Sequence, residues 1–563
     1  MNHSAPRRVA SHRLIRSGLV ALTAAGVLAA PARAQSLDDL KQQIEALQKS
    51  QALQQKRIDQ LESALRRATT EATRQTPRHA KPAAVARTTP VPAAASRETA
   101  RQAAEDARQS AEQARLAATQ AQETASQAKQ ASAQAITDAF TPPPGKPPGT
   151  FRIPNTGVSV RIYGQVKVNG SWDLTTFNRA DALTAQSIAL SGSAAARTGG
   201  DFQASARRSR IGMESWAPTD TVFGDVHALV EMDFAGQNTD LTTQSTANSY
   251  TPRLRRAFVD FGQPDGWGVV LLGQENSLFN DAAIFPLQWL ADWTPGAMSG
   301  VRQAQARYTY GLGNGISASV AVENGYPDIA TSTGISFPDS NGGNGFGFTQ
   351  SPDFTARLMI RRDWGQFALR GVVRPQIELN NQGAITPGTA FAKSTSGWGI
   401  GATGNVNLFD NRVILMATGN YGDGIGRYLD ATSNGFGAVS NAGLPGVVDP
   451  RINAVRVSAG LLGLQLNYTS NLRTNASLFG ALLNYPSYVS QFAGCAGTTG
   501  VGTCNLVNRS LWGASVNLIW SPVRMIDVGV EYQHIERSLQ SGNSTGNNGG
   551  KADRVQVSGI ARF

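Results

Sequence analysis

The sequence contains little cysteine and histidine, and no long apolar run follows its N-terminal segment. Only two of its 563 residues are Cys and five are His, so neither a metal centre of Cys and His nor a disulfide-rich scaffold is expected. A mature spanning helix would need about 18 consecutive apolar residues, and none occurs beyond the N-terminus. Cys495 and Cys504 lie in a Gly/Thr-rich stretch, which predicts a disulfide across a short loop in an oxidising compartment. No cofactor or metal is expected.

Lysine is also scarce where arginine is plentiful. Residues 151–563 contain 27 Arg and three Lys against 28 Asp plus Glu, a balance of +2 within the chain's formal +11. This balance gives no broad basic surface, so no nucleic-acid partner is expected. Guanidiniums favour fixed, bidentate contact with carboxylates, either the protein's own or those of a solute.

The first 34 residues have the pattern of a secretory signal peptide. A basic start with Arg7 and Arg8 precedes the apolar run 18–30, and Ala32 and Ala34 form a small-x-small cleavage site. The arginine pair also permits a twin-arginine signal, but the residues after it do not resemble that motif. We therefore expect the mature protein to be exported.

Two helical segments with different cores follow the signal peptide. Residues 37–68 keep an apolar 3,4 spacing that predicts a coiled coil within 35–72, with Gln51 and Gln54 as polar core layers that fix register. A single amphipathic helix on another surface is the alternative. A Pro/Ala-rich linker is expected at 73–99, an Ala-rich helical segment at 100–140 and a Pro-rich linker at 141–150.

From residue 151 to residue 563 the apolar period changes from 3.6 to 2. Val160, Ile162, Val166 and Val168 alternate with polar residues in the first such segment, which is the pattern of a strand with one apolar face. The same alternation recurs in sixteen segments. They lie at 158–170, 202–215, 221–234, 253–261, 267–274, 302–310, 316–324, 352–361, 365–375, 397–407, 412–421, 453–468, 472–484, 508–520, 525–536 and 552–563.

The connections between these segments alternate between long and short. Long ones are rich in Gly, Asn, Ser and Thr, whereas short ones read like tight turns. This sorting, an even strand number and a final amphipathic strand ending in Phe563 predict an all-β, 16-stranded antiparallel transmembrane β-barrel, preceded by a coiled-coil periplasmic segment. The segment 453–468 is apolar at both its odd and its even positions, which face opposite sides of a strand. A bulge near Gly460 or Gly463, or a subunit contact, is therefore expected there.

The connection 275–300 is too apolar for a solvated external loop. Folding into the lumen would bury its aromatic residues and place Glu275, Asp281 and Asp292 at a constriction. Packing outside, as a lid or against a neighbouring subunit, is the alternative.

Basic side chains recur on the parities that face inward. They line the expected pore as anion contacts: Arg161, Lys167, Arg208, Arg210, Arg256, Arg307, Arg357, Arg361, Arg370 and Arg374. Alternatively, they only pair with carboxylates of the wall, for which the candidates are Asp225, Glu231, Asp233, Asp260, Asp353 and Glu531.

Several stretches resemble the DcaP-like outer-membrane porins. They are GTFRIPNTGVSVRIYGQVKVNGSWD at 149–173, ARRSRIGMESWAPT at 206–219, LRRAFVDFG at 254–262, LLGQENSLFND at 271–281 and VRQAQARYTYG at 301–311. The resemblance implies a trimeric diffusion channel for small anionic solutes such as dicarboxylates. Phosphate-selective porins also carry an N-terminal coiled coil, but they rely on Lys as well as Arg along the lumen.

We therefore expect a passive outer-membrane porin, and no enzyme, because no Ser/His/Asp arrangement stands out. Its N-terminal region would lie in the periplasm, and the expected partners are two further copies of the chain, outer-membrane lipid and, through Phe563, the barrel-assembly machinery. Residues 35–140 could reach the peptidoglycan, so an envelope tether is the second hypothesis. The last strand would supply Arg554 and Arg562 to the lumen, away from the other arginines.

Overall fold

The computed structural model describes the barrel region with gaps in its loops, together with one helix ahead of it. The described residues are 56, 95–140, 145–154, 156–177, 183, 188–236, 251–280, 300–332, 334–336, 345–382, 390–429, 437–492, 507–541 and 548–563. The predicted signal peptide, the coiled coil apart from Lys56, both cysteines, Asp281 and Asp292 lie outside them.

The helix α2 (Ala95–Phe140) spans 46 residues of Ala-rich sequence. It contains neither Gly nor Pro, which favours an uninterrupted helix, and it ends two residues before the proline run that begins at Pro142. The side chains of residues 104–130 are exposed on every face. No helix among the described residues is both long and apolar enough to cross a membrane.

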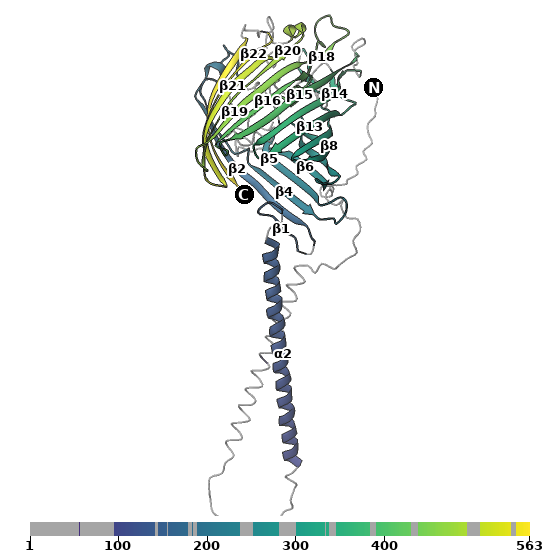
Figure 1. Ribbon diagram of the computed structural model, residues 1–563, viewed down its shortest axis with the longest axis vertical. Helices are drawn as coiled ribbons and strands as arrows, with labels where there is room; N and C mark the ends of the chain where they lie inside the picture. Colours follow the sequence, from purple (N-terminus) through teal and green to yellow (C-terminus); the bar gives the residue numbers. More distant parts are fainter. Residues whose placement is uncertain are drawn as a thin grey trace, which may run out of the picture. The chain divides into compact units, whose positions relative to one another are not determined.

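Sixteen antiparallel strands form a closed barrel, as the alternation predicted (Figure 1). The second barrel strand consists of two segments, β3 and β4. The strands are β2 (Ser159–Asp173), β3 (Asp201–Ser205) with β4 (Arg210–Ala217), β5 (Val226–Gly236), β6 (Thr251–Gln263), β7 (Gly268–Asn276), β8 (Arg302–Gly313), β9 (Ile316–Glu323), β13 (Asp353–Arg362), β14 (Gly365–Asn380), β15 (Ala392–Leu408), β16 (Val413–Asp423), β19 (Arg456–Asn467), β20 (Leu472–Asn484), β21 (Asn508–Val523), β22 (Ile526–Leu539) and β23 (Gly549–Arg562).

The barrel closes where the last strand pairs with the first. β23 runs antiparallel to β2 from the pair Gln165 and Arg562 to the pair Asp173 and Arg554. The backbone of Phe563 continues this ladder, because its N–H and its carbonyl both bond to Gly164, at 3.1 and 3.0 Å. The terminal strand therefore leaves no open edge at this seam.

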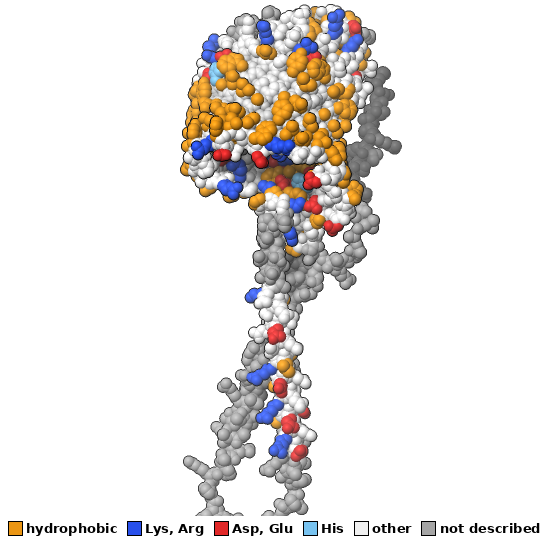
Figure 2. Space-filling model, in the orientation of Figure 1, with side chains coloured by type: hydrophobic (Ala, Val, Ile, Leu, Met, Phe, Trp, Pro, Cys, Tyr) orange, Lys and Arg blue, Asp and Glu red, His pale blue; other side chains and the backbone are white. Residues whose placement is uncertain are grey.

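The parity of the strands separates an outer apolar face from an inner face. In β2, Ile162, Val166 and Val168 are more than half exposed, whereas Asn169 and Ser171 on the opposite parity are buried. Apolar side chains spread across the visible outer face of the barrel, and charged ones gather toward its two ends (Figure 2). This arrangement suits a barrel that faces lipid outside and polar groups inside.

Short strands outside the sixteen barrel strands pair with one another and join the long loops. β10 (Ile329–Ala330) pairs with β11 (Ile335–Ser336) and β17 (Ala438–Ser440), and β17 pairs with β18 (Ile452–Ala454). β12 (Phe346–Phe348) extends the edge of β14, and β1 (Phe151–Arg152) pairs with β2. Three 3-10 turns lie at Ala195–Arg197, Gly426–Tyr428 and Ser487–Gln491.

The bulge that we predicted near Gly460 or Gly463 is wrong. β19 pairs with β16 and β20 without a register shift, so its apolar residues do face both sides. On the inner side, Leu461 belongs to a buried cluster that includes Phe479 and Leu511. The inward-facing residues of β19 are apolar because other residues cover them inside the barrel. A subunit contact on the outer side stays a prediction.

Candidate permeation path

One side of the inner wall is apolar and covered by loops. Apolar inward residues of β19, β20 and β21 share one buried cluster with Leu183, Ile188, Tyr428, Val489 and Phe492, which belong to the long connections. Burying an apolar side chain of this size stabilises the fold by about 1.5–3 kcal/mol. The loops are therefore held against this wall, and the polar path must follow the opposite one.

The connection after β7 begins by turning into the barrel. The backbone N–H of Leu278 donates to Glu323 Oε1 at 3.0 Å, and the carbonyl of Phe279 accepts from the guanidinium of Arg370. The Phe279 ring meets the ring of Tyr428 edge to face, with centroids 5.4 Å apart.

Arg370 lies on the inward parity of β14, and three strands separate β14 from β7. Only a chain that crosses the interior of the barrel can bring these residues together. Residues 277–280 therefore turn into the barrel, and Asp281 and Asp292, which we predicted at a constriction, lie outside the described residues.

Three basic residues that we predicted to line the pore are buried instead. The exposed fractions are 4% for Arg370, 1% for Arg374 and 2% for Lys167. Arg370 donates to Thr418 Oγ1 at 3.0 Å and Asn420 Oδ1 at 3.1 Å as well as to Phe279.

Arg374 is held in the same way, by two carboxylates and two carbonyls. Its guanidinium lies 2.9 Å from Asp328 Oδ1 and 3.3 Å from Asp353 Oδ2, and it donates to the carbonyls of Tyr326 and Gly424. The parity of these strands was predicted correctly, but loops cover the side chains. Arg370 and Arg374 therefore hold loops to the wall and do not line an open pore.

The opposite wall carries guanidiniums that retain exposed surface. Between β5 and β6 the register shifts, because Glu231 pairs with Arg256 while the next residue, Met232, pairs with Leu254. Arg255 is the extra residue of this β-bulge. Consequently Arg253, Arg255 and Arg256 all present their guanidiniums to carboxylates of the inner wall.

Arg253, Arg255 and Arg210 share two buried carboxylates, those of Glu231 and Asp233. Arg253 binds Asp233 through two hydrogen bonds of 3.0 and 2.7 Å, and Arg255 bridges Glu231 Oε1 at 2.8 Å and Asp233 Oδ2 at 2.7 Å. Arg210 of β4 approaches Glu231 Oε2 at 3.6 Å. The side chains of Arg253, Arg210 and Arg255 remain 36%, 29% and 15% exposed.

Arg302, at the start of β8, adds a further positive charge to this group. Its charge is coupled to those of Arg255, Arg253 and Arg210 and to the opposite charge of Asp233, and β5, β6 and β7 separate β8 from β4. Only a side chain that extends into the lumen can reach across these strands. Within the described part of the chain, Arg302 has no hydrogen-bond or ion-pair partner. We call Arg210, Arg253, Arg255 and Arg302 the arginine cluster.

Glu275 ties the predicted loop to this wall. Its Oε2 lies 2.5 Å from Arg256 Nη2, and its Oε1 accepts from the backbone N–H of Asn276 at 2.6 Å. Arg307 donates to Gln305 Oε1 at 3.0 Å and to the carbonyl of Asn276. Both arginines thus stabilise the point at which the loop leaves β7.

The remaining predicted basic residues are spread along the wall. Arg161 lies 3.7 Å from Glu214 and 5.0 Å from the Tyr163 ring. Arg361 donates to Gln366 at 3.3 Å, Arg357 is coupled to the charge of Arg307, and Arg208 lies half-buried between β3 and β4.

The predicted carboxylate partners have mixed outcomes. Glu231, Asp233 and Asp353 do pair with arginine, whereas Asp260 pairs with His227 at 2.8 Å and Asp225 with Lys146 at 2.8 Å. Glu531 accepts from the amides of Asn517 and Gln533. On the terminal strand, Arg554 is fully buried against Asp173 and Arg562 pairs with Asp527 at 2.6 Å.

The prediction missed Arg253, Arg255 and Arg302. A signal existed for Arg255, since the outward parity changes from even at Leu254 to odd at Val259, and a parity change across two consecutive arginines marks a bulge. No such signal existed for Arg302. Its parity in β8 opposes that of the inward residues Gln303 and Gln305.

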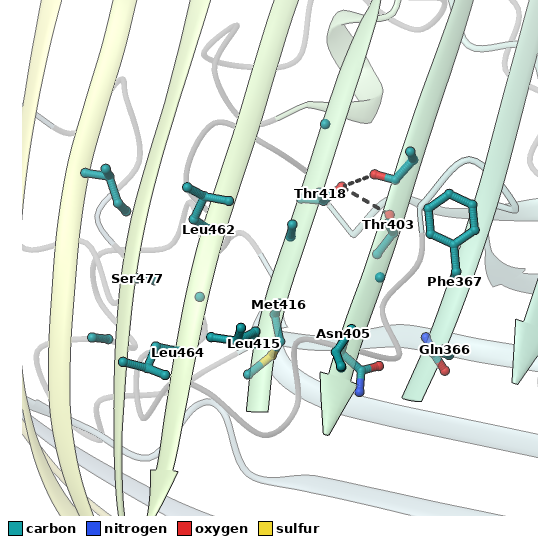
Figure 3. Close-up of a pocket in the computed structure, with 18 of the residues that line it drawn as sticks. Gln366, Phe367, Thr403, Asn405, Leu415, Met416, Thr418, Leu462, Leu464 and Ser477 are labelled. Atoms are coloured by element: carbon teal, nitrogen blue, oxygen red, sulfur yellow. Dashed lines mark hydrogen bonds between the residues drawn. The ribbon is translucent and has the colours of Figure 1, made fainter. Parts of the chain in front are cut away.

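One hollow of the described structure lies on the outer face and is not a solute site. It is a groove of about 960 Å³ on the outer face, where Leu415, Leu462 and Leu464 surround small residues of β15, β16 and β20 (Figure 3). Leu462 is 63% exposed on the parity that faces away from the lumen. Among the described residues, no group of three or more His, Cys, Asp or Glu could hold a metal ion.

A closed sixteen-stranded barrel with one charged wall, one covered wall and an inward loop is the architecture of an outer-membrane channel. Residues 147–555 match the model of the porin subfamily, and the chain belongs to that family. The protein is therefore a channel of the outer membrane and not an enzyme.

Comparison with solved structures supports the fold. The outer membrane channel DcaP of Acinetobacter baumannii is 21% identical with a TM-score of 0.53, and the match covers 73% of this chain and 98% of that one. An anion-selective porin from Comamonas acidovorans is 11% identical with a TM-score of 0.43, covering 72% and 100%. A comparison with curated proteins found no match. The expected likeness to DcaP-like porins is confirmed at the level of family and fold.

Proposed function

We propose that this porin passes small hydrophilic solutes passively and prefers anions, with mono- and dicarboxylates as the best-fitting class. The observation that carries the proposal is the arginine cluster, in which four guanidiniums gather around the carboxylates Glu231 and Asp233. Positive charge gathered at the inner wall in this way would attract anions.

The chemistry of the cluster favours carboxylates. A guanidinium offers two parallel N–H donors that match the two oxygens of a carboxylate. The Arg302 side chain makes no hydrogen bond or ion pair with a described residue, and Arg253 and Arg210 keep exposed surface. A dicarboxylate could contact two of these groups at once, and then pass because each contact is exposed to water and weak.

The test is the reversal potential of the purified protein in planar bilayers under a KCl gradient. A potential of the sign for Cl⁻ permeation supports the proposal, and clear cation selectivity overturns it. Blocking of the current by added succinate at lower concentration than by added phosphate would separate a carboxylate channel from a phosphate-selective one.

The loop after β7 would form the constriction in this account. Glu275 is fixed by Arg256, and the loop carries Asp281 and Asp292 beyond the described residues. Carboxylates at a constriction, together with the arginine cluster, would set a transverse field across the path.

We also propose a homotrimer with the N-terminal region in the periplasm and with Phe563 as the assembly signal. Crosslinking followed by gel electrophoresis tests the trimer. An envelope tether through residues 35–140 and peptidoglycan is the second candidate, carried by the exposed, Ala-rich α2. Deletion of 35–130 would damage envelope integrity without changing conductance if tethering were the main role.

A further inference from the structure

The last residues before the barrel have a conformation that their sequence determines. Gly145 and Gly149 have φ values of +74° and +82°, which side-chain-bearing residues rarely adopt, and Pro147 and Pro148 are stiff between them. Thr150 is 1% exposed, and its hydroxyl donates to the carbonyl of Pro147 at 2.7 Å. The segment 145–150 is therefore an ordered turn and not a flexible spacer.

This turn is attached to the barrel at two places. On one side, Phe151 and Arg152 form β1 and pair with Val160 and Ser159 of β2. On the other side, Lys146 Nζ lies 2.8 Å from Asp225 Oδ2, in the connection between β4 and β5. The connection β4–β5 is one of the short ones, which lie at the periplasmic end of the barrel.

The ammonium of Lys146 also lies 5.5 Å from the centre of the Trp216 ring. Trp216 shares its parity in β4 with Arg210 and Glu214, which face the lumen. The ring stacks on His227 with centroids 5.1 Å apart. Lys146 therefore approaches the wall from its lumenal side, at the periplasmic mouth.

The other charges at this mouth are paired. Arg161 faces Glu214 at 3.7 Å, and His227 bonds to Asp260 at 2.8 Å. The side chains of Lys146 and Asp225 are 21% and 48% exposed, so both charges are in contact with water. Without Lys146, Asp225 would add an uncompensated negative charge to the path of an anion.

We propose that Lys146 is a pore residue, so that the chain ahead of the barrel supplies part of the periplasmic mouth and controls its charge. The proposal rests on the diffusion path of the proposed function, but it does not depend on which ion that path prefers. The neutralised Lys146–Asp225 pair keeps the exit from repelling an anion that the arginine cluster has admitted.

Charge reversal at this position tests the proposal. The variant Lys146→Cys is made in full-length protein in which Cys495→Ser and Cys504→Ser remove the native thiols. It is treated separately with two methanethiosulfonates of similar size. One reagent adds a negative sulfonate, and the other adds a positive trimethylammonium group. The sulfonate should lower the anion-to-cation permeability ratio by about two- to fivefold, the range for one unit charge near 4 Å in a water-like medium. The trimethylammonium group should return the ratio toward that of the channel with Lys146.

Two further variants complete the test. Asp225→Asn, which leaves Lys146 uncompensated, should raise the same ratio. Lys393→Cys, whose lysine forms a similar pair with Asp449 at 2.7 Å beside the long loop 424–455, is the matched control for a Lys–Asp pair far from this mouth.

The proposal is overturned if Lys146→Cys is modified, as shown by mass, without a change in conductance or reversal potential. Failure of both reagents to reach the cysteine in the folded channel overturns it as well. A cation-selective wild-type channel would refute the proposed anion preference, whereas the opposite effects of the two reagents would still support Lys146 as a pore residue.

Discussion

Arg554 of the last strand forms a buried, two-pronged ion pair with Asp173 of the first strand. Its Nε and Nη2 donate to Oδ1 and Oδ2 at 2.7 and 3.0 Å, and the two side chains are 0% and 2% exposed. The pair lies across the seam that closes the barrel. The terminal strand was expected to supply Arg554 to the lumen, but this side chain instead holds the seam together.

Removing one partner of this pair should weaken the closed barrel. Asp173→Ala leaves the Arg554 guanidinium buried without its counter-charge, which typically costs about 3–5 kcal/mol. We expect the temperature at which the folded form is lost on semi-native gels to fall markedly. Asp423→Ala, which breaks the more exposed pair with Arg456, is the control and should change this temperature little.

Arg302→Gln should reduce anion selectivity without destabilising the fold. The Arg302 side chain makes no hydrogen bond or ion pair with a described residue, so Gln at this position removes a positive charge without breaking such a bond. Reversal potentials should move toward the cation side while the unfolding temperature stays unchanged. An unchanged reversal potential would show that the arginine cluster is not on the ion path.

Arg374→Gln should lower the stability of the fold, in contrast to Arg302→Gln, which should lower anion selectivity. The substitution leaves Asp328 and Asp353 buried without their shared cation and releases the carbonyls of Tyr326 and Gly424. The unfolding temperature should fall, because breaking a buried pair costs about 3–5 kcal/mol. If the variant kept its stability and lost only selectivity, the assignment of Arg374 to loop attachment would be wrong.

Phe279→Ala should widen the pore. The fully buried ring packs against Tyr428 and under the Arg370 guanidinium, and removing it forfeits about 3–5 kcal/mol of packing that holds the loop inside. Single-channel conductance should rise and fluctuate more. Tyr488→Ala, which affects a partly buried aromatic residue of a different long loop, serves as the comparison and should leave conductance closer to wild type.

The barrel could be predicted because each strand repeats one physical rule many times. Alternation of apolar and polar residues defines both a strand and the face that meets lipid, as Val166 and Asn169 show in β2. The seam also followed from the sequence, since a closed sheet must pair its last strand with its first.

The positions of the arginines could be predicted only in part. The alternation of residues in β14 predicts that Arg374 faces inward. It does not predict that a loop some fifty residues later in the chain covers this side chain. A single bulge at Arg255 changes which neighbours share a face, and Arg302 is coupled to the arginines of β4 and β6 although its position in β8 alternates with those of the inward residues Gln303 and Gln305. Loop packing and bulges depend on contacts between distant segments, which local periodicity does not encode.

The central claim is that the lumen attracts anions through Arg210, Arg253, Arg255 and Arg302. The most direct measurement is the reversal potential of wild-type protein and of Arg302→Gln in the same KCl gradient, in planar bilayers of one composition. Our account predicts Cl⁻ preference in the wild type and a clear loss of that preference in the variant. Cation preference in the wild type, or identical potentials for both proteins, would contradict it.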